Sequence, residues 1–415
     1  MITLTDEQEK LIQEVIKWYN DPTADNTFEY SGPAGTGKSL VMHLIVDALG
    51  LKEDEIAPMA YTGAAALIMR RNGFIGAKTI HSSIYQSKIN INHKTKQSYV
   101  TWEWKGVNES VKLILIDEAG MVNSQLKLDI DSCNVKVLAC GDLDQLPPVN
   151  SSPAYFTNPN NIFRLTKIMR QSEGNAIIEI SQMLKRGEKI RYGSYGQVEV
   201  IYKKHLMQNL DYYIKEYGTL LCGTNKTRDI LNEIIRKNIL KLNNPIPVQG
   251  EKVICRKNNW SIEVDGINQV NGLCGIVTNN PDISTFKDGY FLMNFRANFM
   301  TQEFTNLKVD YNYFIADYEK RKQLKEQTKK AYNITEYYEY AYALTTYVAQ
   351  GSQFDTGIYL QEYFPSHSSN LNYTGITRFR KRCLYVLPDR MQFSKDYKTY
   401  FNIPLTLIPV PKVNQ

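Results

Sequence analysis

The sequence has few cysteines and no long apolar runs. Its six cysteines lie far apart, with no C-x-x-C pair among them, so neither a zinc site nor a disulfide framework is expected. This spacing favours a reducing compartment, the cytoplasm. No apolar stretch approaches the roughly 18 residues that cross a membrane, and the acidic start Thr5-Asp6-Glu7 lacks the apolar core of a signal peptide. We therefore expect no membrane association.

Charge of one sign is not in large excess either. Lys and Arg number 49 and Asp and Glu number 43, a formal net charge of +6. Such a balance permits nucleic-acid binding but does not require it. With 43% hydrophobic and 22% charged residues over 415 positions, the chain is neither fibrous nor disordered. Its length predicts two to three globular domains.

Short apolar strands alternate with amphipathic helices, which predicts an α/β fold with parallel sheets. Residues 39–49 predict a helix that ends at Gly50, and residues 113–116 and 135–139 predict strands buried on both faces. A polar, strand-like stretch at 84–110 predicts a β-hairpin inserted in the first α/β domain. From residue 250, short strands broken by Asn-Gly and Asp-Gly turns predict a small inserted β-barrel.

These patterns predict two α/β halves, each with an insertion. The first domain covers residues 1–162, with the hairpin at about 84–110. The second domain covers 163–249 and 336–415, and residues 250–335 form the barrel and a charged helix.

Residues 31–39 match the phosphate-binding pattern G-x-x-x-x-G-K-[ST]. Its glycines let backbone N–H groups turn inward around phosphate oxygens at the start of a helix. A lysine in this position supplies a mobile positive charge for the β and γ phosphates, and a hydroxyl supplies a ligand for Mg²⁺. The pattern predicts that ATP is bound by Gly32, Pro33, Ala34, Gly35, Thr36, Gly37, Lys38 and Ser39.

Two adjacent carboxylates follow the apolar strand at 113–116. Asp117 is suited to hold Mg²⁺ together with Ser39, and Glu118 is suited to activate the attacking water. Acidic residues at a strand end are common, but with the phosphate loop some 80 residues upstream they predict a nucleoside triphosphatase.

The ordered motifs resemble those of superfamily 1B DNA helicases of the RecD and Dda-like group, and Dda-type phage helicases in particular. The phosphate loop is similar to motif I, and residues 117–120 resemble motif II, with Gly120 in place of the usual serine. Residues 141–148 are similar to motif III. That resemblance makes Gln145 the sensor of the γ phosphate, where the residues alone also allow a turn stiffened by proline.

Two arginines take their predicted roles from the same resemblance. Residues 165–171 look like motif IV and residues 373–378 resemble motif VI. Arg170 and Arg378 are thereby implied to be arginine fingers that come from the other half of the chain, and a finger typically contributes about 10³–10⁵ in rate. The alternative is a pair of surface arginines.

Three further ATP contacts are implied by the resemblance, and one of them has an alternative explanation. Gln8 would contact adenine, whereas Thr5-x-x-Gln8 is also a helix capping box. Residues 342–355 resemble motif V, which assigns Gly351 and Gln353 to ATP. Tyr347-Val348 departs from the usual His-Lys and puts one cationic contact in doubt.

Contacts to the nucleic-acid strand are the least determined by the residues. A strand needs hydrogen bonds or charges for its phosphates and surfaces on which bases stack. For Thr224 and Asn225, helix capping is an equally good explanation. For Trp102 and Trp104, the alternative is packing against another domain. His81 could equally be a structural histidine. The resemblance implies the contacts Thr62, Gly63, Thr79, His81, Trp102, Trp104, Thr224, Asn225 and Thr345.

The resemblance implies an ATP- and Mg²⁺-dependent DNA helicase that translocates 5′→3′ on single-stranded DNA and unwinds duplex junctions. We expect a monomer in the cytoplasm, the host cytoplasm if a phage encodes it, with single-strand-binding or replication proteins as partners. Three alternatives stay open: another P-loop ATPase such as an oligomeric remodeller, an RNA-acting helicase, or a catalytically silent nucleic-acid-binding module.

Overall fold

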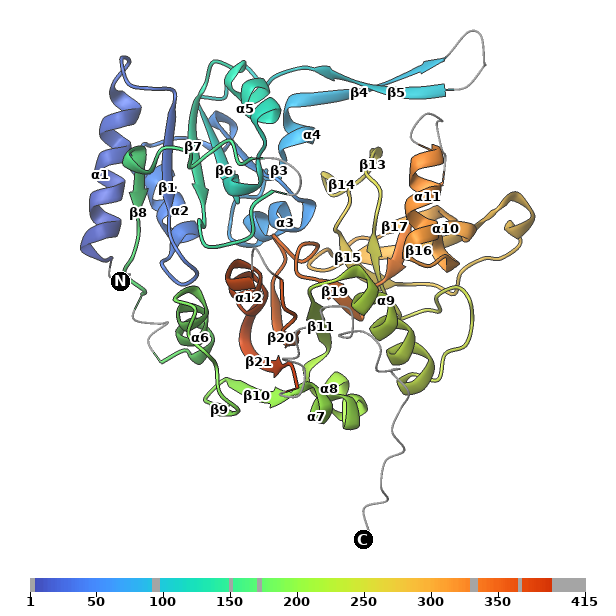
Figure 1. Cartoon of the computed structure of the whole chain (residues 1–415). Helices are drawn as coiled ribbons and strands as arrows, with labels where there is room; N and C mark the ends of the chain where they lie inside the picture. Colours follow the sequence, from blue (N-terminus) through green and yellow to red (C-terminus); the bar gives the residue numbers. More distant parts are fainter. Residues whose placement is uncertain are drawn as a thin grey trace. The chain divides into compact units, whose positions relative to one another are not determined.

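The computed structural model describes residues 4–91, 98–148, 152–169, 174–328, 335–364 and 368–389. They belong to two compact units (Figure 1). The first unit is drawn from Met1–Glu173, Asn244–Ala341 and Gln350–Ser352. The second is drawn from Gly174–Asn243, Tyr342–Ala349 and Gln353–Gln415.

A parallel six-stranded sheet forms the centre of the first unit. Its order is β3-β2-β6-β7-β1-β8, with β1 at Thr27–Ser31, β2 at Ile56–Ala60, β3 at Lys78–Thr79, β6 at Leu113–Asp117, β7 at Lys136–Gly141 and β8 at Ile162–Arg164. Three helices pack on one face: α1 (Asp6–Asn20), α2 (Lys38–Ala48) and α3 (Gly63–Arg71). The other face carries α4 (Ile80–Ile84) and α5 (Ser124–Asp131). Short 3₁₀ turns span Glu53–Glu55, Ala119–Met121 and Pro159–Asn161.

Both faces of this sheet are buried, as a continuous apolar strand requires. Leu113 and Leu115 join the core formed with α1 and α2, whereas Ile114 and Ile116 join the core on the opposite face. Successive side chains of a strand point to opposite faces, so the unbroken run Leu-Ile-Leu-Ile fills both cores. The expectation that residues 113–116 form a strand buried on both faces is confirmed.

A two-stranded hairpin projects from this sheet. It consists of β4 (Tyr85–Ile91) and β5 (Ser98–Trp104), paired antiparallel from Tyr85↔Trp104 to Ile91↔Ser98. Figure 1 shows it as a long ribbon beyond α4 and α5. This is the hairpin expected at 84–110.

The remaining part of the first unit is an antiparallel barrel. Its sheet has the order β17-β16-β15-β12-β18, with β12 at Lys252–Cys255, β15 at Cys274–Val277, β16 at Tyr290–Ala297, β17 at Phe304–Asp310 and β18 at Tyr338–Tyr340. A bridge between Val309 and Glu336 joins β17 to the residues before β18 and closes the sheet. Alternate residues of β16 fill the interior. A hairpin of β13 (Asn259–Val264) and β14 (Ile267–Gln269), the turn Phe286–Asp288, and helices α10 (Tyr311–Ile315) and α11 (Tyr318–Thr328) complete this part.

The second unit contains another six-stranded sheet. Its order is β19-β11-β20-β21-β10-β9, parallel except for β9 against β10. The strands are β9 (Gly193–Tyr195), β10 (Val198–Tyr202), β11 (Thr219–Cys222), β19 (Ala343–Thr345), β20 (Phe354–Leu360) and β21 (Phe379–Leu387). The helices are α6 (Ala176–Lys185), α7 (Lys203–Gln208), α8 (Leu210–Tyr217), α9 (Asn225–Ile234), a π turn at Ile235–Ile239 and α12 (Ser368–Ile376).

Two predicted boundaries differ from the strand pairing. β8 begins at the expected boundary but pairs with β1, so the first sheet continues past residue 162. β18 lies beyond residue 335 and pairs with β12, so the barrel sheet continues to Tyr340. Long-range backbone pairing decides both positions, and the local sequence pattern does not reveal it. No helix among the described residues is long and apolar enough to span a membrane.

Candidate nucleotide site and strand contacts

The phosphate loop lies between the end of β1 and the start of α2, and its shape depends on glycine. Gly35 and Gly37 have φ values of 89° and 79°, a region that residues with a Cβ rarely adopt. A Cβ on Gly37 would come within 2.7 Å of Gln8 Nε2 and 2.6 Å of Met169 Sδ. Only glycine therefore fits at position 37, the residue before the helix whose first N–H groups attract an anion.

Lys38 folds back over its own loop. Its Nζ donates to the carbonyl oxygens of Gly32 at 2.6 Å and of Pro33 at 3.2 Å. An ammonium held by two carbonyls within the turn can exchange them for phosphate oxygens without a large movement. A tight glycine turn, a lysine above it and the Ser39 hydroxyl in the first turn of α2 together fit a triphosphate with its metal.

The carboxylates follow β6, which is separated from β1 only by β7. The backbone N–H of Glu118 donates to Asp117 Oδ1 at 2.9 Å. Glu118 has φ of 53°, a left-handed conformation that typically costs about 1–3 kcal/mol outside glycine and is common at functional sites. Burial raises the pKa of the Cys140 thiol well above its usual value, and the Asp117 carboxylate raises it further. The thiol at the end of β7 thus stays neutral beside this carboxylate.

The described residues contain no cluster of three or more His, Cys, Asp or Glu side chains that could hold a metal ion by themselves. The expected Mg²⁺ site would not require such a cluster, because Mg²⁺ usually takes one or two protein ligands and completes its shell with phosphate oxygens and water. Ser39 and Asp117 suit such a site.

The third segment follows β7, beside β1. The N–H of Gly32 donates to Gly141 O at 3.1 Å, which ties the phosphate loop to this strand end. Asp142 is buried and accepts from Asp144 N at 3.0 Å and from Gln145 Nε2 at 3.4 Å. Gln145 is therefore held by the same turn that is bonded to the phosphate loop.

The structure adds a contact that the residue pattern did not reveal. Gln350 Nε2 donates to Leu146 O at 2.9 Å, and the Gln350 side chain is buried. Its neighbour Gly351 has φ of 74°, and a Cβ there would come within 2.4 Å of Thr62 Oγ1. The 350–351 segment thus joins the loop that holds Gln145 to a predicted strand contact. The motif V pattern singled out both residues, but only tertiary packing shows what Gln350 touches.

Gln8 performs the capping role, and its amide reaches the phosphate loop as well. Gln8 N donates to Thr5 Oγ1 at 3.3 Å and Thr5 N donates to Gln8 Oε1 at 2.9 Å, so the capping box is confirmed. Gln8 Nε2 donates to the Thr36 carbonyl at 2.9 Å, and only 1% of Gln8 is exposed. A contact with adenine remains a prediction, and the amide retains one further hydrogen for it.

We expect Gln8→Ala to lower the free energy of unfolding by about 1–3 kcal/mol, because the buried Thr36 carbonyl loses its donor. If Gln8 also reads adenine, the KM for ATP rises relative to the KM for GTP. Thermal unfolding and the ratio of the two KM values measure these effects separately. Gln13→Ala, on the exposed side of α1, is the matched control; a normal melting curve for Gln8→Ala would contradict the structural role.

A carboxylate that the sequence did not single out holds the segment after β8. Glu7 accepts from Thr166 N at 2.7 Å, from Thr166 Oγ1 at 2.5 Å and from Lys167 N at 2.9 Å. Burial raises the pKa of Glu7, but these hydrogen bonds outweigh it and the pKa is lowered overall. Met169 N donates to Gly35 O at 3.1 Å. Residues 165–169 thus pack on the phosphate loop within the first unit, whereas they were expected in the second domain; Arg170 lies outside the described residues.

The chain is similar to several known proteins over part of its length. A family model described as "AAA domain" matches residues 3–203. The ATP-dependent RecD2 DNA helicase of Deinococcus radiodurans is 24% identical over 380 residues, 85% of this chain and 46% of that protein. The ATP-dependent DNA helicase dda of Enterobacteria phage T4 is 28% identical over 261 residues, 57% and 58% of the two chains. The ATP-dependent DNA helicase RRM3 of Saccharomyces cerevisiae is 28% identical over 45% of this chain and 28% of that protein.

Solved structures agree on the fold. Pif1 helicase from Candida albicans superposes with a TM-score of 0.52 at 19% identity, covering 96% of this chain and 97% of that one. Bacteroides Pif1 bound to ssDNA gives 0.53 at 17% identity, covering 94% and 95%. Over part of its length the chain is thus similar to proteins named as RecD2 and Dda DNA helicases, and it shares the fold of the Pif1 structures. The expected fold, two α/β halves with a hairpin and a barrel inserted, is confirmed. The match covers between about a quarter and three fifths of the curated relatives' own lengths.

In this chain, the three threonines that are predicted to contact the DNA strand each cap a helix. Thr62 accepts from Ala65 N at 3.1 Å, Thr79 from Ser82 N at 3.3 Å and Thr224 from Thr227 N at 3.1 Å. Each follows a strand and begins α3, α4 or α9. The capping alternative for Thr224 is confirmed. A contact with the DNA strand through the same hydroxyl or the helix N–H groups stays a prediction.

The other predicted residues of the second unit are held by local contacts. Asn225 Oδ1 accepts from Arg228 Nη1 at 2.9 Å, and Thr345 Oγ1 accepts from Val348 N at 3.4 Å. Arg378 is 5% exposed, and its Nε donates to Thr374 O at 3.2 Å. Gln353 is half-buried at the start of β20. The roles of these four residues remain predictions.

In this chain, aromatic rings connect the hairpin and α4 to the barrel. His81 stacks on Trp260 with 5.8 Å between ring centroids, and Trp102 meets Trp260 edge-on at 5.4 Å. Burial lowers the pKa of His81, although Asp129 opposes this. Trp104 Nε1 donates to Asp129 O at 3.0 Å. Packing against another domain is thus confirmed for Trp102, whereas Trp104 bonds to α5 of its own domain; 42% of Trp102 and 47% of Trp104 stay exposed.

Gly63 is required by packing. It is buried, and a Cβ there would lie 2.3 Å from Val270 Cγ2 of the barrel. Its predicted contact with the strand could therefore use only the backbone.

Proposed function

We propose that this protein is an ATP-dependent DNA helicase that translocates 5′→3′ on single-stranded DNA and unwinds duplexes. One observation carries the proposal: the phosphate loop, Asp117-Glu118 and the turn with Gln145 follow β1, β6 and β7, three adjacent strands of one parallel sheet. In open α/β sheets, ligands bind at the carboxyl ends of the strands. The names of the relatives support DNA as the substrate, and the direction of travel rests on the family resemblance.

Each side chain at these strand ends has a distinct task. ATP with Mg²⁺ supplies the phosphoryl group and a cation that neutralises its oxygens. Lys38 stabilises negative charge on the β and γ phosphates, while Ser39 and Asp117 hold the metal. Glu118 accepts the proton of the attacking water, and its strained backbone fixes the direction of its carboxylate. Gln145 hydrogen-bonds the terminal phosphate and loses that partner after hydrolysis.

The 350–351 segment provides a physical path from nucleotide to strand. Gln350 holds the backbone beside Gln145, and Gly351 packs against Thr62, a proposed strand contact. A shift of the Gln145 turn after phosphate release would alter the support of Thr62. We infer that this packed contact couples the nucleotide state to the grip on DNA.

The strand is proposed to run over the helix N-termini that begin after Thr62, Thr79 and Thr224, because backbone N–H groups at such ends attract phosphates. The exposed faces of Trp102 and Trp104 suit the duplex junction at the hairpin. The protein is proposed to act as a cytoplasmic monomer, and single-strand-binding or replication proteins would be its partners.

The decisive test is Lys38→Ala. We expect DNA-stimulated ATP hydrolysis to fall by roughly 10²–10³, the usual loss when a fixed group that stabilises transition-state charge is removed. Phosphate release is measured with and without single-stranded DNA. Lys17→Ala, which removes an exposed lysine from α1, should retain the full rate. Unchanged turnover in Lys38→Ala would refute the assigned site.

Two added measurements separate the alternatives. An RNA strand of the same sequence in the phosphate-release assay distinguishes an RNA helicase from a DNA helicase. Light scattering with ATP distinguishes a monomer from an oligomeric remodeller, in which a neighbouring subunit would supply the arginine finger. A silent binding module would show no hydrolysis with either strand.

A further inference from the structure

A cavity of about 700 Å³ lies in the first unit, away from the nucleotide site. It is bordered by Ile56 and Ala57 at the start of β2 and by Val111 before β6, at the amino edge of the sheet. The phosphate loop, the carboxylates and the Gln145 turn are at the carboxyl edge and contribute nothing to its lining. ATP bound at the carboxyl edge would therefore not occupy this cavity.

One side of the cavity carries two ammonium groups. Lys78 is half-buried on β3, and Lys105 follows β5 at the root of the hairpin, where its Nζ donates to Ser82 O at 3.1 Å. Neither forms an ion pair with a described carboxylate. Burial lowers the pKa of Lys105, the positive charge of Lys78 lowers it further, and Glu263 opposes both. An anion between the two lysines would relieve this repulsion.

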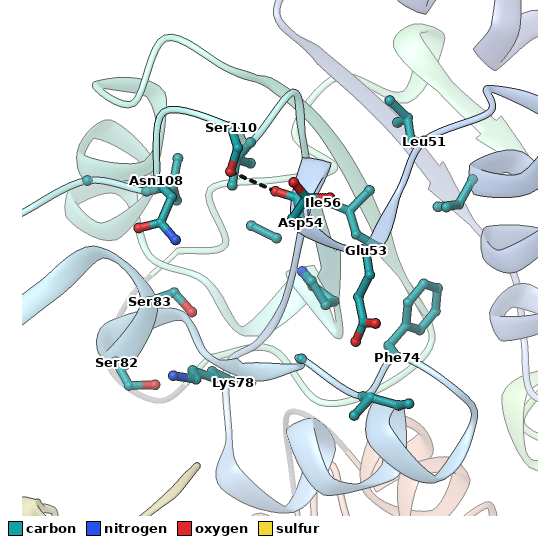
Figure 2. Close-up of a pocket in the computed structure, with 18 of the residues that line it drawn as sticks. Leu51, Glu53, Asp54, Ile56, Phe74, Lys78, Ser82, Ser83, Asn108 and Ser110 are labelled. Carbon is teal, nitrogen blue, oxygen red and sulfur yellow. Dashed lines mark hydrogen bonds between the residues drawn. The ribbon is translucent and has the colours of Figure 1, made fainter.

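The other side carries carboxylates and apolar surface. Figure 2 shows Glu53 and Asp54 across the cavity from Lys78, Ser82 and Ser83. Leu51, Ile56, Val107 and Val111 also line the cavity and form its apolar wall, and Ile75 at the rim is 70% exposed.

The loop at that rim is held firmly. Phe74 stacks on His43 with ring centroids 3.8 Å apart and an interplanar angle of 10°. Gly73 has φ of 107°, and a Cβ there would lie 3.1 Å from the His43 ring. This loop at the edge of the cavity is therefore preformed, as the walls of small-molecule sites usually are.

We propose that this cavity binds a nucleotide unit, with its phosphate between Lys78 and Lys105. The base lies against the apolar wall, and Glu53 and Asp54 accept hydrogen bonds from its exocyclic amino group, as carboxylates do from cytosine. An acidic peptide suits the lysines but is repelled by the two carboxylates. The bound nucleotide is either a free monophosphate or one unit of a DNA strand that passes the root of the hairpin. The second case rests on the proposed function.

The first experiment titrates the full-length chain with AMP, CMP, GMP, UMP and inorganic phosphate by calorimetry, with Lys38→Ala as background so that the phosphate loop contributes little. We expect the three amino-bearing nucleotides to bind at least fivefold more tightly than UMP. Lys78→Ala/Lys105→Ala should weaken them at least tenfold, and each single variant should weaken them less. Lys10→Ala/Lys17→Ala removes equal charge from α1 and should change binding less than twofold.

The second experiment measures single-stranded DNA affinity against salt with the native Lys38. If the nucleotide belongs to a DNA strand, the double lysine variant should lose about 0.7 from the slope of log K against log salt, since the one phosphate held between the two lysines contributes about 0.7, while monophosphates bind weakly. Glu53→Gln/Asp54→Asn should abolish discrimination against uracil in whichever source binds.

Two results would overturn the proposal. One is monophosphate and strand binding that the lysine pair does not change; the other is inorganic phosphate binding as tightly as the nucleotides, which would show an anion site without a base. DNA-stimulated hydrolysis, measured alongside, tells the two proposals apart. If the protein hydrolyses ATP but the cavity binds no nucleotide, only the cavity proposal is rejected. If a monophosphate binds but DNA does not stimulate hydrolysis, only the helicase proposal is rejected.

Discussion

Arg378→Ala should reduce DNA-stimulated ATP hydrolysis by about 10³–10⁵, the range typical of a lost arginine finger. The guanidinium would stabilise charge on the transferring phosphoryl group, so the loss appears in kcat and the KM for ATP changes little. The substitution also removes the hydrogen bond from Nε to Thr374 O, which costs about 1–3 kcal/mol of stability because the donor is charged and buried, less than the total stability of a typical domain. The variant should therefore remain folded, and single-turnover hydrolysis measures the catalytic loss.

Two further variants make this result specific. Arg378→Lys keeps the charge but loses the planar fork that matches phosphate, so it should recover only part of the rate. Arg380→Ala removes an exposed arginine two residues away and should leave hydrolysis intact. Equal rates for Arg378→Ala and Arg380→Ala would show that Arg378 is only a buried structural residue of the second unit.

Much of the fold could be predicted because its elements are marked locally. The run 113–116 is apolar at every position, and both faces of β6 are buried. Gly35 and Gly37 of the phosphate loop mark positions where φ is positive. Alternating residues also located the hairpin. Each of these features depends on neighbouring residues in the sequence, so the amino-acid pattern alone determines it.

The positions that were missed depend on distant partners. β18 joins the barrel because it pairs with β12, more than 80 residues earlier, and β8 joins the first sheet because it pairs with β1. Glu7 holds Thr166, and Gln350 holds Leu146. No local pattern reveals these partners, because Glu7 and Gln350 meet them only when the chain has folded.

The threonines show a different difficulty. Thr62, Thr79 and Thr224 each follow a strand and cap the next helix. A cap hydroxyl and a phosphate-binding helix N-terminus need the same residue type in the same place. The pattern therefore located the three positions correctly but could not separate a structural role from a strand contact.

Glu118→Gln should lower kcat for ATP hydrolysis by about 10²–10⁴, the usual contribution of a general base. Glutamine has the same shape and can keep the backbone at φ of 53° with its N–H bonded to Asp117, but its amide cannot accept a proton from water. ATP affinity should remain within a few-fold of the original, as equilibrium binding with the slowly hydrolysing variant would show. Glu109→Gln, an exposed acid before the same strand, is the matched control.

Asp117→Asn separates the two neighbouring carboxylates. If Asp117 holds the metal, this variant should require more Mg²⁺ for half-maximal hydrolysis, whereas Glu118→Gln should keep the original Mg²⁺ requirement at its reduced rate. The distinction follows from chemistry, because an amide oxygen is a weaker ligand for a hard cation than a carboxylate. A Mg²⁺ requirement raised equally by both substitutions would mean that the pair acts as one metal site, and that the base must be sought elsewhere.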